Sequence, residues 1–364
     1  MAIPAFQTLR DYWLFFAGES ERGRSPLYAQ LSREIAEDEG LQALAARATP
    51  RQPPANLLFG AVHYLLLGGV QHPLRAWYPH LSLQPEPAEN PFPVFKDFCK
   101  TFEAELLPVI STRVTNTNEV RRSAMLYPGF TFLARLSKQK LHLVEIGPSA
   151  GLNLCFDRYA YGYSFPGSAE TACGDLTSPL TLPCEARGAV RPPLDPHPPA
   201  IASRVGLELN PVDLSREEDV RWLKALIWPG PVDRMTRIEA ALSIVAADPP
   251  RILAGDAVGL LPSVLAGLPG EGAVVVFHSH VTYQFPAEAR ARLRAILAEA
   301  SASRVIFRLS IEWEGENYPL KLERWENGHC EEGLLAMTDP HGSHLTWIGE
   351  WPHKGEASQI SENK

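Results

Sequence analysis

The stretch LVEIGPSAGLNL, residues 143–154, decides how the rest of the chain is interpreted. It begins with a short apolar run, Leu143 to Ile146, which favours a buried β-strand. Gly147, Pro148 and Gly151 then predict a tight turn. Ser149 is suited to cap a helix that starts at the turn and continues through SAGLNLCFDRYA. A strand, a glycine-rich turn and a helix in this order predict the first unit of a parallel α/β sheet.

The residues after this stretch continue the same alternation of short apolar runs and amphipathic segments. Further strands are expected at SRVGLELN, RILAGD, GAVVVFHS and SRVIFRLS, and helices at residues 213–228, 234–247 and 286–301. Ser215 and Glu218 have the spacing of a capping box. The segment after residue 317 predicts an antiparallel hairpin that turns at Asn327-Gly328. The fold class is therefore a mostly parallel Rossmann-like α/β sheet with an antiparallel C-terminal hairpin.

The chain before this sheet has a different spacing of apolar residues. Apolar residues recur there at three- and four-residue spacing, which predicts an all-helical N-terminal domain over residues 1–138. One of its helices is expected at 92–110, and another at 119–136 that breaks at Pro128-Gly129. The α/β domain covers 139–352, with an irregular, proline-rich insertion at about 160–203 that could cover a site. Residues 353–364 form a polar tail.

Composition limits the classes of partner. The net charge of -8 gives no overall positive field for nucleic acid, so we expect none as a ligand. The five cysteines are widely spaced, with no zinc-site pattern, which indicates reduced thiols and a cytoplasmic protein. No signal peptide is evident, and the longest apolar stretch, 57–70, is too short to span a bilayer. The sequence does not predict the oligomeric state.

Two enzyme classes share the pattern of residues 145–151. Gly147-Pro148-Ser149-Ala150-Gly151 fits G-x-S-x-G, the turn that presents a nucleophilic serine in α/β-hydrolases. A hydrolase requires strands and an oxyanion loop before that turn, and the preceding residues predict helices. Glu145 with Gly147 and Gly151 instead matches E-x-G-x-x-x-G, typical of the first loop of methyltransferases that use S-adenosylmethionine (SAM). Proline and serine stand where a dinucleotide-binding loop has its second glycine, which disfavours NAD.

The methyltransferase interpretation assigns a role to acids at successive strand ends. Gly147, Ser149 and Gly151 form the cofactor loop, with Glu145 within reach of the cofactor's amino group. Glu208, at the end of the next strand, is expected to bind the ribose hydroxyls. Asp256 and Ala257, after the third strand, are expected beside the adenine. No single one of these features is specific; their order along the chain carries the prediction.

The fourth strand supplies the candidate catalytic residues. His278 and His280 lie two residues apart at its end, so their side chains point to one side. An imidazole is a suitable general base for deprotonating a nucleophile, and structural hydrogen bonding is the alternative role. Tyr283 follows and could shape the substrate pocket. A metal site is not predicted, because no third ligand is evident beside the two histidines.

Three long strings, TRVTNTNEVRRSAML, LVEIGPSAGLNLCFDRYAY and RVGLELNPVDLSREEDVRWLKALIWP, resemble the bacterial family of domain of unknown function 2332. The resemblance runs over nearly the whole chain. It implies helices packed on a methyltransferase-like α/β domain, and it adds Asn118, Glu119 and Arg122 as candidate substrate-binding residues. That family more often has aspartate where Glu208 stands, and the longer side chain of Glu208 changes the geometry expected for the ribose contact.

The sequence thus predicts a SAM-dependent methyltransferase that acts on a small molecule. The alternatives are a SAM- or nucleotide-binding protein without methyl transfer, which would have a regulatory role, and a serine hydrolase that uses Ser149.

Overall fold

The structure is a computed structural model that describes residues 8–49, 52–82, 87–116, 119–230 and 233–352. The described residues divide into two compact units. A helical unit contains residues up to 118 together with 212–239, and a sheet unit contains 119–211 and the chain from 240 on. The domain boundary expected at 138 falls at the C-terminal end of a helix that belongs to the sheet unit.

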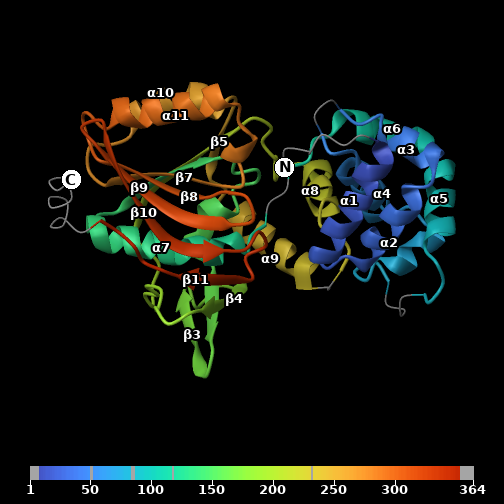
Figure 1. Ribbon diagram of the computed structural model, residues 1–364, viewed down its shortest axis with the longest axis horizontal. Helices are drawn as coiled ribbons and strands as arrows, with labels where there is room; N and C mark the ends of the chain where they lie inside the picture. The colour runs from blue at the N-terminus through green and yellow to red at the C-terminus, as the bar shows by residue number, and fades with distance from the viewer. Residues whose placement is uncertain (1–7, 50–51, 83–86, 117–118, 231–232, 353–364) are drawn as a thin grey trace, which may run out of the picture. The chain divides into compact units, whose positions relative to one another are not determined.

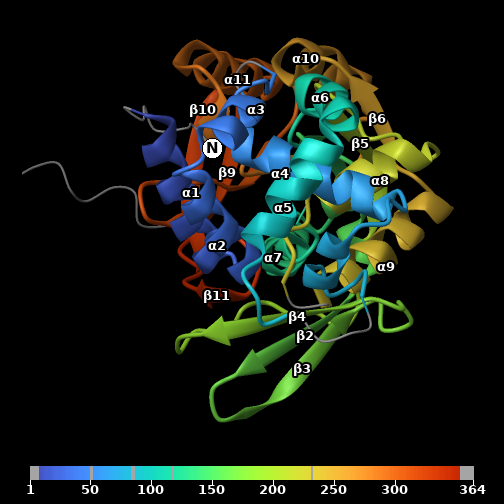
Figure 2. The same cartoon turned by 90° about the vertical axis from the view of Figure 1, so that its right-hand side faces the viewer.

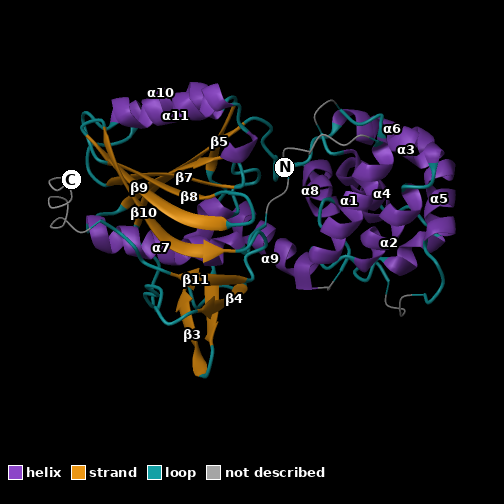
Figure 3. Ribbon diagram, in the orientation of Figure 1, coloured by secondary structure: helices purple, strands orange, loops and turns teal. Residues whose placement is uncertain are grey.

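The helical unit contains no strand among its described residues, as Figure 3 shows. Its elements are α1 (Leu9–Arg22), α2 (Pro26–Ile35), α3 (Glu39–Ala45), α4 (Pro54–Leu67), the 3₁₀ helix η1 (Pro73–Trp77), α5 (Phe92–Thr101), α6 (Glu103–Thr112), α8 (Glu217–Ala225) and the start of α9 (Asp233–Ala247). Aromatic rings fill its core: Phe59 of α4 stacks on Tyr28 with 4.1 Å between centroids and meets Trp13 edge-on. Within the described ranges, no helix is both long enough and apolar enough to cross a membrane.

The sheet unit is built on one mixed sheet of eleven strands in the order β3-β2-β4-β11-β10-β9-β8-β7-β1-β5-β6. Its strands are β1 (Leu141–Ile146), β2 (Ala160–Phe165), β3 (Ser168–Gly174), β4 (Thr181–Arg187), β5 (Ile201–Glu208), β6 (Arg251–Ala254), β7 (Ala273–Ser279), β8 (Ile306–Ile311), β9 (Tyr318–Glu326), β10 (His329–Thr338) and β11 (His344–Trp347). The strands β8-β7-β1-β5-β6 are all parallel, as predicted for the α/β domain.

Helices cover both faces of this parallel region (Figure 1). α10 (Ala257–Gly267) and α11 (Ala287–Ala300) lie over one face, and α7 (Arg122–Ser137) lies over the other. On the α7 side, Phe130 stacks on Phe156 at 4.0 Å and meets Phe277 of β7 at 5.1 Å. β1 is buried along its whole length because both of its faces are covered.

Three predictions about helices are wrong. The turn after β1 leads into a short 3₁₀ helix, η2 (Asn153–Arg158), instead of an α-helix, and β2 starts two residues later. α7 continues through Pro128-Gly129 without a break. A Cβ at position 129 would lie 3.0 Å from Leu309 of β8, so the glycine allows the helix to approach the sheet. Residues 92–112 form two helices, α5 and α6, joined at Phe102.

The capping box predicted at Ser215 is also absent. The Ser215 hydroxyl donates to Asp213, and α8 begins at Glu217 without a side-chain cap. The Ser215 hydroxyl bonds to Asp213 instead of capping α8, because an aspartate two residues before a serine forms a local turn of its own.

The segment expected to be irregular adds three strands to the sheet. β2 and β3 form an antiparallel hairpin, β4 pairs with β2, and β11 joins this group to β10 by parallel pairing with β4. Figure 2 shows β2, β3 and β4 side by side at the end of the sheet. The prediction of an irregular insertion therefore holds only for the stretch between β4 and β5.

The C-terminal hairpin is confirmed. β9 and β10 pair antiparallel around Asn327 and Gly328, which both adopt positive φ (51° and 79°). β8, β9 and β10 are consecutive neighbours in the sheet, so the hairpin directly extends the parallel region.

Candidate functional site

The predicted cofactor-binding and catalytic residues lie at or just after the carboxyl ends of the parallel strands of the sheet unit. The chain passes from β1 to β5 and β6 on one side and then to β7 and β8 on the other. The order of strands therefore reverses between β1 and β7. Small molecules bind to open α/β sheets outside the carboxyl ends of the strands at such a reversal. Glu145 of β1 and His278 of β7 are the next-to-last residues of the two strands that flank it.

The turn after β1 is held in an unusual backbone conformation. Gly147, Ser149 and Gly151 all have positive φ (71°, 54° and 79°). A Cβ on Gly147 would lie 2.7 Å from a methyl of Val281, and one on Gly151 would lie 2.7 Å from the ring of Pro250. Packing within the chain alone therefore requires both glycines. Ser149 is 2% exposed, which contrasts with the exposed serine of a hydrolase turn.

The carboxylate of Glu208 ties this turn to the neighbouring strand. One oxygen accepts the backbone N–H of Ser149 at 2.9 Å, and the other accepts that of Asn210 at 3.0 Å. Each oxygen of a carboxylate has two lone pairs, so both retain capacity to accept a further donor. The residue is 8% exposed at the carboxyl end of β5.

Glu145 is a buried acid without a full set of partners. It is 2% exposed, and its Oε2 has no hydrogen-bond partner within the described part of the chain. Burial and the nearby charge of Glu208 raise its pKa well above the usual range, against the opposing charge of Arg122. Burial and the charge of Glu208 thus favour the protonated form of Glu145, which can donate one hydrogen bond.

Asp256 has a structural role that the sequence also allowed. It is the N-cap of α10, where its carboxylate accepts the N–H of Gly259 at 3.0 Å. Ala257 is buried as the first residue of that helix. Asp256 itself is exposed, so the side of the carboxylate away from the cap faces solvent.

His278 forms a charge-assisted pair with a residue that the sequence did not point to. Its Nδ1 lies 2.6 Å from Oε1 of Glu312, the residue directly after β8. Since an ionised carboxylate only accepts hydrogen bonds, Nδ1 carries the proton and Nε2 is left as an acceptor. Nε2 has no partner among the described residues, and the side chain is 1% exposed.

Glu312 is anchored by backbone groups as well. It accepts the N–H groups of Val281, Thr282 and Tyr283 at 3.0–3.1 Å. Although burial raises the pKa of Glu312, the hydrogen bond from His278 and these N–H groups lower it to about 2. The orientation of His278 is thus set by a permanently ionised carboxylate. A signal for Glu312 was present in the sequence, because an acid directly follows the fifth parallel strand.

His280 and Tyr283 belong to a group of rings beside this pair. The ring of His280 stacks on Tyr318 at 5.1 Å, and Tyr283 meets His280 and Trp313 edge-on at 6.4 Å. His280 has a positive φ of 58°, a conformation that costs a non-glycine residue about 1 kcal/mol or more. Burial and the charge of Arg122 lower its pKa to about 2, so its ring is neutral.

Arg122 is the cation of this region. It begins α7, and its Nε–H donates to the carbonyl of Pro340 at 3.2 Å. Burial lowers its pKa, and Glu119, Tyr283 and Glu312 act against that effect in decreasing order. The structure therefore brings the predicted residues Glu119 and Arg122 together with Tyr283 and His280. Asn118 lies outside the described residues.

The two sets of predicted residues share Glu145 as their common neighbour. The pKa of Glu145 is raised by Glu208, a predicted cofactor-binding residue, and lowered by Arg122, a predicted substrate-binding residue. Among the residues that the structure describes, no three histidine, cysteine or acidic side chains are placed to hold a metal ion. The groups available for chemistry are a histidine base, a buried carboxyl and a guanidinium.

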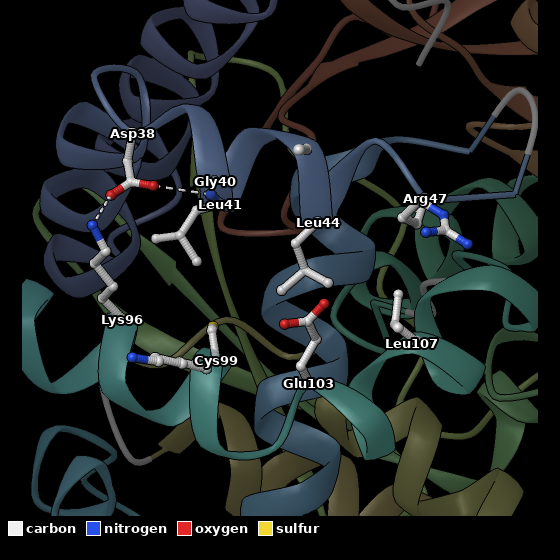
Figure 4. Close-up of a pocket in the computed structure, with 11 residues that line it drawn as sticks. Asp38, Gly40, Leu41, Leu44, Arg47, Lys96, Cys99, Glu103 and Leu107 are labelled. Atoms are coloured by element: carbon white, nitrogen blue, oxygen red, sulfur yellow. Dashed lines mark hydrogen bonds and ion pairs between the residues drawn. The ribbon is translucent and has the colours of Figure 1, made fainter.

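A separate cavity of about 330 Å³ lies in the helical unit, between α3, α5 and α6 (Figure 4). Leu41, Leu44 and Leu107 contribute apolar surface to it, and Lys96 at its edge is paired with Asp38 at 2.6 Å. None of the predicted site residues lines this cavity.

Comparison with known proteins places the chain by sequence alone. A family model described as "Uncharacterized protein conserved in bacteria (DUF2332)" matches residues 10–347. No curated protein and no solved structure matches.

Proposed function

The chain belongs to the uncharacterised bacterial family DUF2332, and we propose that it is a SAM-dependent methyltransferase that acts on a small molecule in the cytoplasm. One observation carries the proposal. Acidic side chains occur at or just after the carboxyl ends of the adjacent parallel strands β1, β5 and β6, beside the reversal of strand order. That is where a sheet of this kind binds nucleotide-like ligands.

Three side chains are suited to hold the cofactor. Glu145 has a buried carboxyl oxygen without a partner in the described part of the chain, which fits a polar group of a ligand. Glu208 retains lone pairs for the ribose hydroxyls, and Asp256 has an exposed carboxylate for the adenine amine. The backbone bonds that Glu208 already makes orient it in advance, so binding requires little rearrangement. When bound, SAM supplies an activated methyl group.

The histidine pair provides the proton acceptor for a nucleophile. Nε2 of His278 is available to take a proton, and Glu312 holds Nδ1–H and stabilises the imidazolium that results. The ionised form of Glu312 persists over the whole physiological range, because its pKa is lowered to about 2. The buried surroundings exclude water from the proton acceptor, which favours transfer from the substrate instead.

Calorimetry with SAM and with S-adenosylhomocysteine tests this proposal. Both ligands should bind with a dissociation constant below about 1 mM, which corresponds to a binding free energy of about −4 kcal/mol or better. Glu208→Gln should weaken binding about tenfold or more, because an amide cannot accept as strongly from two ribose hydroxyls. The amide oxygen of the variant can still accept the Ser149 N–H, which keeps the turn intact.

The matched control is Glu288→Gln, an exposed residue on α11. It should bind both ligands like the unaltered protein. Absence of heat from both ligands at millimolar concentration would refute the proposal.

A second candidate is a SAM- or nucleotide-binding regulatory protein without methyl transfer. It is favoured by the fact that Glu208 and Asp256 already have hydrogen-bond partners within the chain. Binding of SAM without its consumption in the presence of metabolite extract would support it. The serine hydrolase is disfavoured by the burial of Ser149, and labelling by a fluorophosphonate that disappears in Ser149→Ala would revive it.

A further inference from the structure

The guanidinium of Arg122 has an unused hydrogen-bonding edge. Its Nε–H is bonded to Pro340, while Nη1 and Nη2 make no hydrogen bond or ion pair within the described part of the chain. Burial is nevertheless the largest influence on its pKa, so the group is not a freely solvated surface arginine. The side chain keeps partial exposure, and its Nη atoms are not among the buried unpartnered atoms, so the Nη edge is accessible to a ligand. The Nη edge of arginine matches a planar oxyanion through two parallel hydrogen bonds.

Two buried, unpartnered atoms belong to the same group of side chains. Nε2 of His278 has no partner among the described residues, and neither does Oε2 of Glu145. Both side chains are almost completely buried. The charge of Arg122 acts on the pKa of Glu145, and His278 is hydrogen-bonded to Glu312, whose charge acts on Arg122. Buried polar atoms are nearly always paired, so two unpaired ones beside an unpaired guanidinium edge point to a polar ligand.

The surrounding charge selects the kind of anion. Glu119, Glu312 and Asp339 all act on Arg122, and each is an acid. A ligand with two negative charges, such as a phosphate monoester, would be repelled by this environment more strongly than a ligand with one. A carboxylate has the single charge and the planar shape that this guanidinium requires.

The rings indicate the body of the ligand. Tyr283 is influenced by the charge of Arg122, and it is in edge contact with His280 and Trp313. Trp313 is 47% exposed, an unusual exposure for so large an apolar side chain, and it directly follows Glu312. Exposed aromatic surface beside a polar anchor is typical of sites for flat organic ligands.

We propose that the second ligand of this site, the methyl acceptor, is an aromatic carboxylate whose carboxyl group binds to Nη1 and Nη2 of Arg122 and whose ring lies against Tyr283 and Trp313. The assignment as methyl acceptor rests on the proposed function. The binding of an aromatic carboxylate does not, and it can be measured without SAM.

Benzoate is the probe for this experiment, with benzamide, acetate and inorganic phosphate as comparisons. Binding is followed by ligand-observed NMR and by tryptophan fluorescence in the absence of SAM. Benzoate should bind at least about tenfold more tightly than benzamide, which lacks the charge, and than acetate, which lacks the ring. Phosphate should bind more weakly than benzoate. Equal binding of benzamide and benzoate, or tighter binding of phosphate, would overturn the proposal.

Variants locate the site. Arg122→Gln should weaken benzoate binding about tenfold or more, whereas Arg135→Gln, on the same helix and paired with Asp195, should leave it unchanged. Trp313→Ala changes an exposed residue, so it should fold normally even if Arg122→Gln does not; it should weaken benzoate binding several-fold. Unaltered benzoate binding in Trp313→Ala would contradict the ring contact.

Binding of SAM by the same variants separates the two proposals. Arg122→Gln should bind SAM like the unaltered protein. If it loses SAM and retains benzoate, Arg122 belongs to the cofactor site and the present inference is wrong. If benzoate binds as expected and SAM does not bind at all, the carboxylate site stands and the methyltransferase proposal fails.

Discussion

Two carboxyl groups, Glu145 near the end of β1 and Glu312 directly after β8, have pKa values that are shifted in opposite directions. Glu145 has few hydrogen-bond donors around it, and burial raises its pKa well above the usual range. Glu312 is also buried, yet three backbone N–H groups and His278 lower its pKa to about 2. The number of donors therefore decides the direction in which the pKa of each acid shifts, and burial alone does not.

Replacement of Glu312 tests this difference. Glu312→Gln should destabilise the protein by about 2–3 kcal/mol at pH 7, because an amide presents donors to groups that are donors themselves. The lowered pKa of Glu312 means that its stabilisation is complete above the unfolded value of 4.5 and is lost as pH falls toward about 2. The deficit of the variant, measured by urea unfolding, should shrink between pH 5 and pH 3.

The matched control is Glu314→Gln, at an exposed pair with Lys321. It should change stability by less than about 1 kcal/mol at either pH. A deficit of Glu312→Gln that stays constant from pH 7 to pH 3 would contradict the assignment of a charged carboxylate.

At the scale of single residues, the strand end at which a residue lies could be predicted, but its hydrogen-bond partners could not. The strand pattern located Glu145, Glu208 and His278 at strand ends, where the structure has them. The pairing of Glu312 with His278 was missed because the two residues lie more than thirty positions apart in sequence. No local pattern reports a hydrogen bond across two strands. Asp256 was open to two interpretations, since a helix cap and a ligand contact use the same residue type.

At the scale of elements, the turn between β1 and η2 is the most constrained segment. Gly147→Ala should cost about 2–4 kcal/mol, since it adds a methyl group against Val281 and puts a Cβ on a residue with φ of 71°. Gly315→Ala is the control, because Gly315 has a similar φ of 67° and open space around it. It should cost about 1 kcal/mol, the conformational part alone.

A second change isolates the contact itself. In a Val281→Ala background, Gly147→Ala should destabilise the protein by about 1–2 kcal/mol less than it does in the unaltered protein. A double-mutant cycle of urea unfolding measures this difference. Additive effects would show that Val281 does not set the requirement for glycine.

Element boundaries depended on contacts that a local pattern does not contain. Pro128-Gly129 usually breaks a helix, but Gly129 faces Leu309 and allows α7 to lie close to the sheet. The segment after Gly151 has helix-compatible residues, yet it forms one 3₁₀ turn before β2 pairs with β4. In both places a tertiary contact overrode the local preference.

At the scale of the whole molecule, buried neutral histidines make stability depend on pH. His63 and His80 lie in the helical unit with their Nε2 atoms 2.8 Å apart. Burial lowers the pKa of His63 to about 3 and that of His80 to about 4. Because the unfolded chain binds a proton at each of them below about pH 6.5 and the folded chain does not, stability is full above pH 6.5 and falls as pH decreases.

The helical unit should therefore lose about 1.4 kcal/mol per pH unit for each of these histidines as pH falls from about 6.5 toward about 4.5. His80→Gln should remove about half of that slope in urea unfolding followed at several pH values. His329→Gln, an exposed residue on β10, is the control and should leave the slope unchanged. A slope that His80→Gln leaves intact would contradict the pair as its source.

The sheet as a whole could be predicted only in its parallel region. The alternation of short apolar runs and helices specified β1, β5, β6, β7 and β8 and their parallel sense. The strands β2, β3 and β4 escaped prediction because prolines and glycines interrupt them and their partners are distant in sequence. Neither segment contains a sequence pattern that predicts the parallel pairing of β4 with β11.

That pairing also bears on how the chain is completed as it leaves the ribosome. β11 (His344–Trp347), the last strand that the structure describes, pairs with both β4 (Thr181–Arg187) and β10 (His329–Thr338). Until it is synthesised, two strand edges present unpaired N–H and C=O groups, and such edges recruit other chains. A nascent or shortened chain that ends before residue 344 should therefore aggregate or depend on chaperones, although every residue of the candidate site is already present.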